Sequence, residues 1–178
     1  MNMKKINIIA ISLLLLSGCS SYSPILTEKN INLKKFMGDW YVIANIPTFI
    51  EEGAHNAIES YKLEKDGHIA TTFRFNKDSF DGEEKTYHPK GFIVDNSSNA
   101  IWEMQFIWPF KSDYRILYVN KDYTQTIIGR IKRDYVWIMA RNHKINDADY
   151  KHMLDIIKTE GYDTSKIQLV PQQDKRIK

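Results

Sequence analysis

The side chain with the clearest chemistry in this sequence is the thiol of Cys19, the only cysteine among 178 residues. It follows Leu16-Ser17-Gly18, and an apolar stretch from Ile6 to Leu16 precedes it after two lysines. A positive start, a short apolar middle and small residues before a cut site are typical of a secretory signal peptide. A cysteine directly after the cut can carry a diacylglycerol thioether and an acylated amino group. The pattern therefore predicts a leader over residues 1–18 and lipidation of Cys19, as in exported bacterial lipoproteins.

An alternative interpretation is a plain cleaved signal, or a short membrane helix, with a chance cysteine. The apolar run has 11 residues, whereas a helix needs about 20 to cross a bilayer. We therefore expect export and acyl anchoring, and several acyl chains together hold a protein stably on a membrane. Ser20 is not acidic, which in a Gram-negative host indicates the outer membrane, with the protein facing the periplasm.

Residue types for catalysis or metal binding are sparse in the rest of the chain. The five histidines are scattered, and none has the H-x-x-x-H or Cys/His spacing of a metal site. No Ser/His/Asp order is accompanied by a nucleophile turn. We therefore expect no enzyme activity, no metal and no cofactor.

Length and charge bound the remaining possibilities. The chain from Cys19 onward has 160 residues, which suits one domain with a real core. Removing the two leader lysines from 25 basic residues leaves 23 against 22 acidic ones, so nothing indicates a nucleic-acid partner. We expect a lipidated tether over residues 19–30, a folded domain over residues 31–171 and a flexible basic tail over residues 172–178.

The elements that follow are mostly β-strands, because apolar and aromatic residues recur at every second position. The expected strands span residues 40–46, 57–65, 68–75, 87–94, 101–108, 114–120, 125–131 and 135–141. Turn signals such as Asp66-Gly67 separate them. A helix is expected to begin after Asn146 and to end near Gly161. The sequence thus predicts an all-β fold: a closed, eight-stranded antiparallel up-and-down β-barrel with one C-terminal α-helix packed outside.

Three short motifs occur in order along this pattern. Gly38-Asp39-Trp40-Tyr41 opens the first expected strand, Asp122 and Tyr123 lie in the turn between the sixth and seventh, and Arg141 ends the eighth. With these motifs the chain resembles the lipocalins, in particular the bacterial lipocalin lipoproteins and their relative apolipoprotein D. The resemblance covers roughly residues 31–171. It implies that Trp40 plugs the closed end of the barrel and that Arg141 lies across the tryptophan ring, an attractive cation–π contact.

Strand alternation and the resemblance together predict the inner face of the barrel. The resemblance implies that Tyr61 and Trp137 face the ligand, and alternation supplies the others. The expected ligand-binding residues are Tyr61, Phe73, Phe75, Trp102, Met104, Phe106, Tyr114, Tyr118 and Trp137. Alternation also places Trp108 and Ile127 inside. Glu59 shares this face near the mouth, and we expect it to be exposed at the rim or paired, since an unpaired buried carboxylate is costly.

For function, the resemblance implies binding and storage or transport of fatty acids or lysophospholipids, in maintenance of the cell envelope under stress. Two alternatives stay open: a carrier of a non-lipid hydrophobe, such as a sterol-like or tetrapyrrole compound, and a dimeric scaffold lipoprotein. The aromatic run Ile107-Trp108-Pro109-Phe110 suits either insertion into a membrane or a homodimer surface.

Overall fold

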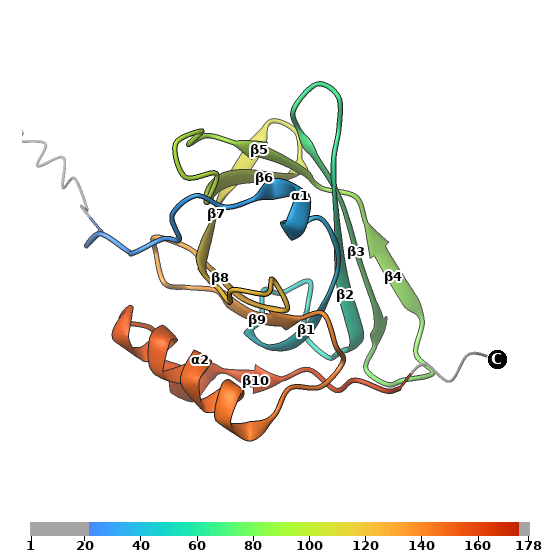
Figure 1. Ribbon diagram of the computed structural model, residues 1–178. Helices are drawn as coiled ribbons and strands as arrows, with labels where there is room; N and C mark the ends of the chain where they lie inside the picture. The colour runs from blue at the N-terminus through green and yellow to red at the C-terminus, as the bar shows by residue number, and fades with distance from the viewer. Residues whose placement is uncertain (1–21, 175–178) are drawn as a thin grey trace, which may run out of the picture.

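The computed structural model describes residues 22–174 of the chain. The expected leader, the lipidation site Cys19 and the last four residues of the expected tail lie outside the described residues. Within them, a short helix precedes a long run of strands, and one longer helix follows it (Figure 1). In chain order the elements are α1 Leu33–Phe36, β1 Gly38–Ile46, β2 Ala54–Leu63, β3 Ile69–Lys77, β4 Glu84–Tyr87, β5 Lys90–Ile93, β6 Ile101–Ile107, β7 Phe110–Val119, β8 Gln125–Gly129, β9 Val136–Ala140, α2 Asp147–Thr159, the 3-10 turn η1 Thr164–Lys166 and β10 Gln168–Leu169.

The strands form one antiparallel sheet that closes on itself. From β1 to β9 the strands pair in the order β1-β2-β3-β5-β6-β7-β8-β9, and β9 returns to pair with β1, with Tyr41 opposite Ala140. The short strand β10 pairs with the other end of β1. The strands β4 and β5 follow one another along β3 and together take the place of one barrel strand. The barrel therefore counts as eight-stranded. Among the described strands, closure leaves only short edges, such as the outer side of β4, which pairs with β3 alone. The expected barrel is confirmed.

Most expected strand boundaries differ from the structure by one to three residues, and the largest differences are in two places. The expected strand over residues 87–94 begins three residues too late and is interrupted: β4 ends at Tyr87 and β5 begins at Lys90, because Pro89 has no N–H to donate to the ladder. The expected loop over residues 109–113 is mostly strand, since β7 already begins at Phe110. The β6–β7 hairpin is therefore longer than expected, and only Trp108 and Pro109 join its strands.

The helix α2 packs on the outside of the barrel, as expected. The Asn146 side chain caps it by accepting a hydrogen bond from the Asp149 N–H, and Gly161, at φ +86°, follows its end. Met153 and Ile157 are fully buried against the outer face of β1, β8 and β9. The molecule thus has two apolar cores, one inside the barrel and one beneath α2.

The closed end of the barrel is built around Trp40 and Arg141, as the resemblance implies. The guanidinium carbon of Arg141 lies 3.7 Å from the centroid of the Trp40 ring. The same guanidinium donates hydrogen bonds of 2.7–3.0 Å to the carbonyls of Lys35, Phe36, Met37 and Asp39. Gly38 has φ +95°, a backbone conformation that side chains rarely adopt. In Figure 1 the helix α1 lies over the barrel interior at this end.

Both flanking segments contact the barrel. Residues 22–30 belong to the expected tether, and within them Ile25 is buried and the Glu28 N–H donates to the Ile116 carbonyl at 3.0 Å. Gln172 and Gln173, placed in the expected flexible tail, hydrogen-bond to β1 and β2. The ordered contacts of the domain therefore extend past residue 171.

Candidate ligand-binding cavity

A cavity of about 330 Å³ occupies the half of the barrel opposite Trp40 and opens to solvent there. The mouth lies among the loop of residues 47–53, the β6–β7 hairpin and the β8–β9 turn. This volume is in the range of small-molecule sites. The lining residues are Thr48, Phe49, Ile50, Glu51, Glu59, Phe73, Met104, Phe106, Ile107, Phe110, Ser112, Asp113, Tyr114, Arg130, Tyr135 and Trp137.

Five of the nine expected ligand-binding residues line this cavity. They are Phe73, Met104, Phe106, Tyr114 and Trp137. They come from β3, β6, β7 and β9, of which β6 and β7 pair directly: Trp102 lies opposite Tyr114, and Met104 lies opposite Ser112. These walls are apolar and aromatic, so they suit a hydrophobic molecule.

Three other expected residues are buried on the inner side but do not line the cavity. Tyr61 and Trp102 lie beneath it, where their rings contact Phe36 with centroids 5.7 and 5.6 Å apart. Phe75 packs between Phe73 and Tyr87. Tyr61 and Trp102 form an aromatic floor with Phe36 and Trp40, and this floor keeps a ligand away from the closed end.

The inward orientation expected for Tyr118 is wrong. Its ring contacts His152 of α2, with centroids 5.7 Å apart, on the outside of the barrel. The β7–β8 register shifts between Ile116 and Tyr118. Such a bulge places one extra residue on the strand and reverses the alternation beyond it.

The expected positions of Trp108 and Ile127 are also wrong. Trp108 is 82% exposed at the tip of the β6–β7 hairpin. Ile127 packs in the core beneath α2, while its neighbour Ile128 belongs to the interior core opposite Trp137. A single-residue change of register exchanges the two faces of a strand.

The carboxyl group of Glu51 lines the cavity, although Glu51 is not among the expected ligand-binding residues. It accepts hydrogen bonds from Trp137 Nε1 at 2.6 Å and from the Thr48 N–H and hydroxyl at 2.9 and 2.8 Å. Burial raises its pKa, and these hydrogen bonds act against that rise. Glu51 thus fixes the loop of residues 47–53 over the cavity and holds the Trp137 ring in one orientation.

Glu59 is not exposed at the rim, and it has no ion pair among residues 22–174. It lies on β2, opposite Trp40 of β1 on one side and Phe73 of β3 on the other. Its side chain lines the cavity, and the residue is 8% exposed. Burial raises the pKa of Glu59 to about 7, and the charge of Glu51 adds to the rise. Beside it the Tyr61 and Tyr114 hydroxyls hydrogen-bond to each other, and burial raises the pKa of both phenols. The lower cavity therefore repels a negative charge when Glu59 is ionised.

The raised pKa of Glu59 predicts a loss of stability as pH rises. An unfolded glutamate ionises near 4.5, whereas the folded one holds its proton to about 7. The stabilising contribution is therefore fully present below pH 4.5 and is lost between pH 4.5 and about 7. We expect Glu59→Gln to remove up to about 3 kcal/mol of this pH dependence, as measured by urea unfolding from pH 4 to 8.

Glu83→Gln, at an exposed carboxylate of the β3–β4 loop, is the control for Glu59→Gln and should leave the pH profile unchanged. If the Glu59→Gln profile matches that of the unmodified protein, Glu59 does not titrate as its burial requires.

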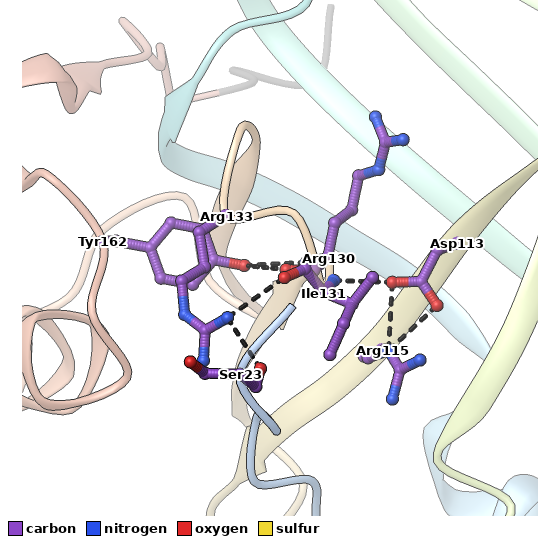
Figure 2. Close-up of polar contacts among 7 residues, drawn as sticks. All are labelled: Ser23, Asp113, Arg115, Arg130, Ile131, Arg133 and Tyr162. Atoms are coloured by element: carbon purple, nitrogen blue, oxygen red, sulfur yellow. Dashed lines mark hydrogen bonds and ion pairs between the residues drawn. The ribbon is translucent and has the colours of Figure 1, made fainter. Parts of the chain in front are cut away.

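The cation nearest the cavity is Arg130, in the turn after β8. It lines the mouth, its guanidinium lies 5.3 Å from the Tyr135 ring centroid, and Nη1 is 3.3 Å from an Asp134 oxygen. Its buried Nε has no hydrogen-bond partner among the described residues. Figure 2 shows the side chain pointing away from the neighbouring Arg133 and Tyr162 contacts. Among the described residues, Arg130 is thus the cation that lines the cavity, and it is ion-paired with Asp134. Carboxyl groups are supplied to the lining by Glu51, Glu59 and Asp113.

Among residues 22–174, no cluster of three or more His, Cys, Asp or Glu side chains could hold a metal ion. No helix within the same range is long and apolar enough to span a membrane.

Comparisons with known proteins agree with this architecture. A family model described as Lipocalin-like domain matches residues 31–172. The chain is 30% identical over 155 residues to temperature-induced lipocalin-1 of Arabidopsis thaliana, covering 82% of each chain. It is 28% identical over 162 residues to outer membrane lipoprotein Blc of Escherichia coli (strain K12), covering 89% of this chain and 90% of the relative.

More distant similarities extend the comparison. Mouse apolipoprotein D is 28% identical over 155 residues, covering 82% of this chain and 79% of its own. Among solved structures, insecticyanin from the tobacco hornworm Manduca sexta aligns with a TM-score of 0.69 at 15% identity, covering 86% and 87% of the two chains. At that identity the alignment is evidence of a shared fold alone.

Proposed function

We propose that this chain, which belongs to the lipocalin family, holds one hydrophobic lipid, a fatty acid or a lysophospholipid, for storage or transport. The observation that supports this most strongly is the cavity itself, which has aromatic and aliphatic walls, a closed aromatic floor and one open mouth. An acyl chain gains free energy by leaving water for such walls. The proposed role of the protein is to bind a ligand and not to catalyse a reaction, as is general for lipocalins.

The polar groups favour one orientation of the lipid. Glu51 and Glu59 lie inside, so a carboxylate or phosphate head group entering the cavity would meet like charge. Arg130 lies at the mouth, where an anionic head group would find a cation and water. The lipid is therefore proposed to enter tail first, with the head group at the mouth beside Arg130.

We further propose that residues 1–18 are a cleaved leader and that Cys19 carries the acyl anchor. The proposal rests on the sequence pattern and on the relatives that are named outer membrane lipoproteins. In a Gram-negative host this places the barrel on the periplasmic side of the outer membrane. A carrier there works beside its lipids, which fits a role in envelope maintenance under stress.

One observation favours a second candidate ligand. The rings of Tyr114 and Trp137, which both line the cavity, are stacked with centroids 6.4 Å apart. Trp102, in the floor, continues this stack, with its centroid 5.5 Å from that of Tyr114. A flat tetrapyrrole or sterol-like molecule could stack on such a wall as well as an acyl chain could lie along it.

Native mass spectrometry of residues 20–178 tests the proposal. We expect one oleate or one lysophospholipid per chain, bound with micromolar affinity or tighter, and weaker binding by Phe73→Ala. Binding of a tetrapyrrole with neither lipid bound would favour the second candidate. A stable dimer that binds none of these compounds would support the scaffold alternative and contradict a carrier role.

A further inference from the structure

We infer that the mouth of the barrel docks on the membrane surface to which the chain is anchored, so that a lipid passes between bilayer and cavity without crossing open water. The inference rests on the proposed acylation of Cys19 and on the proposed lipid cargo. Its structural basis is that an exposed apolar patch and the start of the described chain both lie at the open end.

The mouth patch consists of Phe49, Phe106, Ile107, Trp108 and Phe110. Phe49 is 81% exposed, Ile107 72% and Phe110 75%. These side chains come from two loops that surround the cavity entrance, and four of them also line it. Several large apolar side chains gathered at one place on a surface mark a site of interaction with a membrane or a protein.

The charges around the patch indicate how it would bind. Lys132, Asp134 and Glu52 are all exposed in the loops at this end, so the two signs are mixed. Electrostatic attraction to an anionic surface is therefore weak, and insertion of the apolar side chains supplies the binding energy. Aromatic side chains such as Trp108 favour the boundary between head groups and acyl chains.

The path of the N-terminal segment supports the membrane as the surface that the mouth patch contacts. Arg133, in the β8–β9 turn at the open end, donates a hydrogen bond to the Ser23 carbonyl at 3.1 Å (Figure 2). It donates another to the Pro24 carbonyl at 2.9 Å. From there the segment runs along the barrel to Ile31, whose N–H donates to the Ser98 carbonyl at the closed end. The chain before Ser23 therefore starts from the open end.

The reach of the chain from Ser23 to Cys19 is similar to the distance by which the β6–β7 hairpin extends beyond β8. Cys19 is four residues before Ser23, a reach of up to about 14 Å. The β6–β7 hairpin extends five residues past Arg115, which pairs with Gly129 at the end of β8, or up to about 17 Å along the strand. An acyl chain on Cys19 and the hairpin tip can thus meet the same membrane plane. With a tether this short, docking through the closed end would require the contacts of residues 23–31 to break.

The test uses the full-length, membrane-anchored protein reconstituted in phosphatidylcholine vesicles. Because Cys19 is the only cysteine and its thiol would be blocked by the lipid, an introduced cysteine is the single site for an environment-sensitive dye. The probes are Phe49→Cys and Ile107→Cys at the mouth. The matched controls are Leu63→Cys and Val94→Cys, which are exposed apolar residues at the closed end.

We expect dye at the two mouth positions to show blue-shifted emission and to be quenched by lipids with spin labels on their acyl chains, and dye at the control positions to show neither. Equal quenching at both ends, or none at the mouth, would overturn the inference. Mouth cysteines that cross-link between copies without lipid quenching would identify a second copy as the occupant and also overturn it. Labelling of the protein without an introduced cysteine reports failure of the proposed anchor instead, because Cys19 would then be free.

Discussion

Replacing Trp40 with alanine is expected to lower the free energy of unfolding by about 4 kcal/mol, the range for removing a large buried aromatic side chain. Trp40 is completely buried, its Nε1 donates to the Phe36 carbonyl at 2.8 Å and its ring lies beneath the Arg141 guanidinium. The change removes the packing of the closed end and leaves a cavity under Arg141. Urea unfolding followed by circular dichroism measures the loss.

The control is the same substitution at Trp108, which is 82% exposed. Trp108→Ala is expected to change the free energy of unfolding by no more than about 0.5 kcal/mol. At temperatures where Trp40→Ala stays folded, it should still bind lipid, since Trp40 does not line the cavity. A Trp40→Ala protein with unchanged stability and lost binding would contradict this account, because Trp40 would then contact the ligand rather than stabilise the closed end.

Filling the cavity through Ser112→Trp is expected to weaken lipid binding at least about tenfold, or 1.4 kcal/mol, with little change in stability. Ser112 lies opposite Met104 on the inner face of the hairpin, near the mouth, where an indole has room to turn into the cavity. It would then occupy the space proposed for the acyl chain. Competition with a fluorescent fatty acid measures the affinity.

Lys111→Trp is the matched control, because Lys111 is the next residue on β7 and its ammonium group contacts Glu103 and the Phe92 ring outside the cavity. It adds the same side chain to the outer face and should leave affinity unchanged. Equal affinities for the two variants would show that the lipid does not enter the barrel.

Much of the architecture could be predicted from local pattern. The period of two gave the barrel strands, and Asn146 and Gly161 marked the ends of α2, because alternation and capping are local properties of the chain. The Trp40–Arg141 contact followed from the resemblance, and the structure contains it. Five of the expected ligand-binding side chains line the cavity, although the β6–β7 register shifts between Met104 and Ile107.

What could not be predicted depends on bulges and on the loop over the mouth. A bulge in β7 turns Tyr118 toward α2, and nothing in the local sequence distinguishes it from a regular strand. The burial of Glu51 and Glu59 depends on the fold of residues 47–53 and on Trp137, which is 86 residues from Glu51 in sequence. The raised pKa values of these two carboxyl groups therefore could not be predicted from the sequence.

The most direct test of the central claim, that one acyl chain lies inside the barrel, is quenching of tryptophan fluorescence by a brominated stearate, which acts only at contact. Trp137 lines the cavity, whereas Trp108 lies at the hairpin tip outside it. We predict saturable quenching that is largely lost in Trp137→Phe and kept in Trp108→Phe. Quenching that is kept in Trp137→Phe and lost in Trp108→Phe would place the lipid on the outer rim and contradict a ligand inside the barrel.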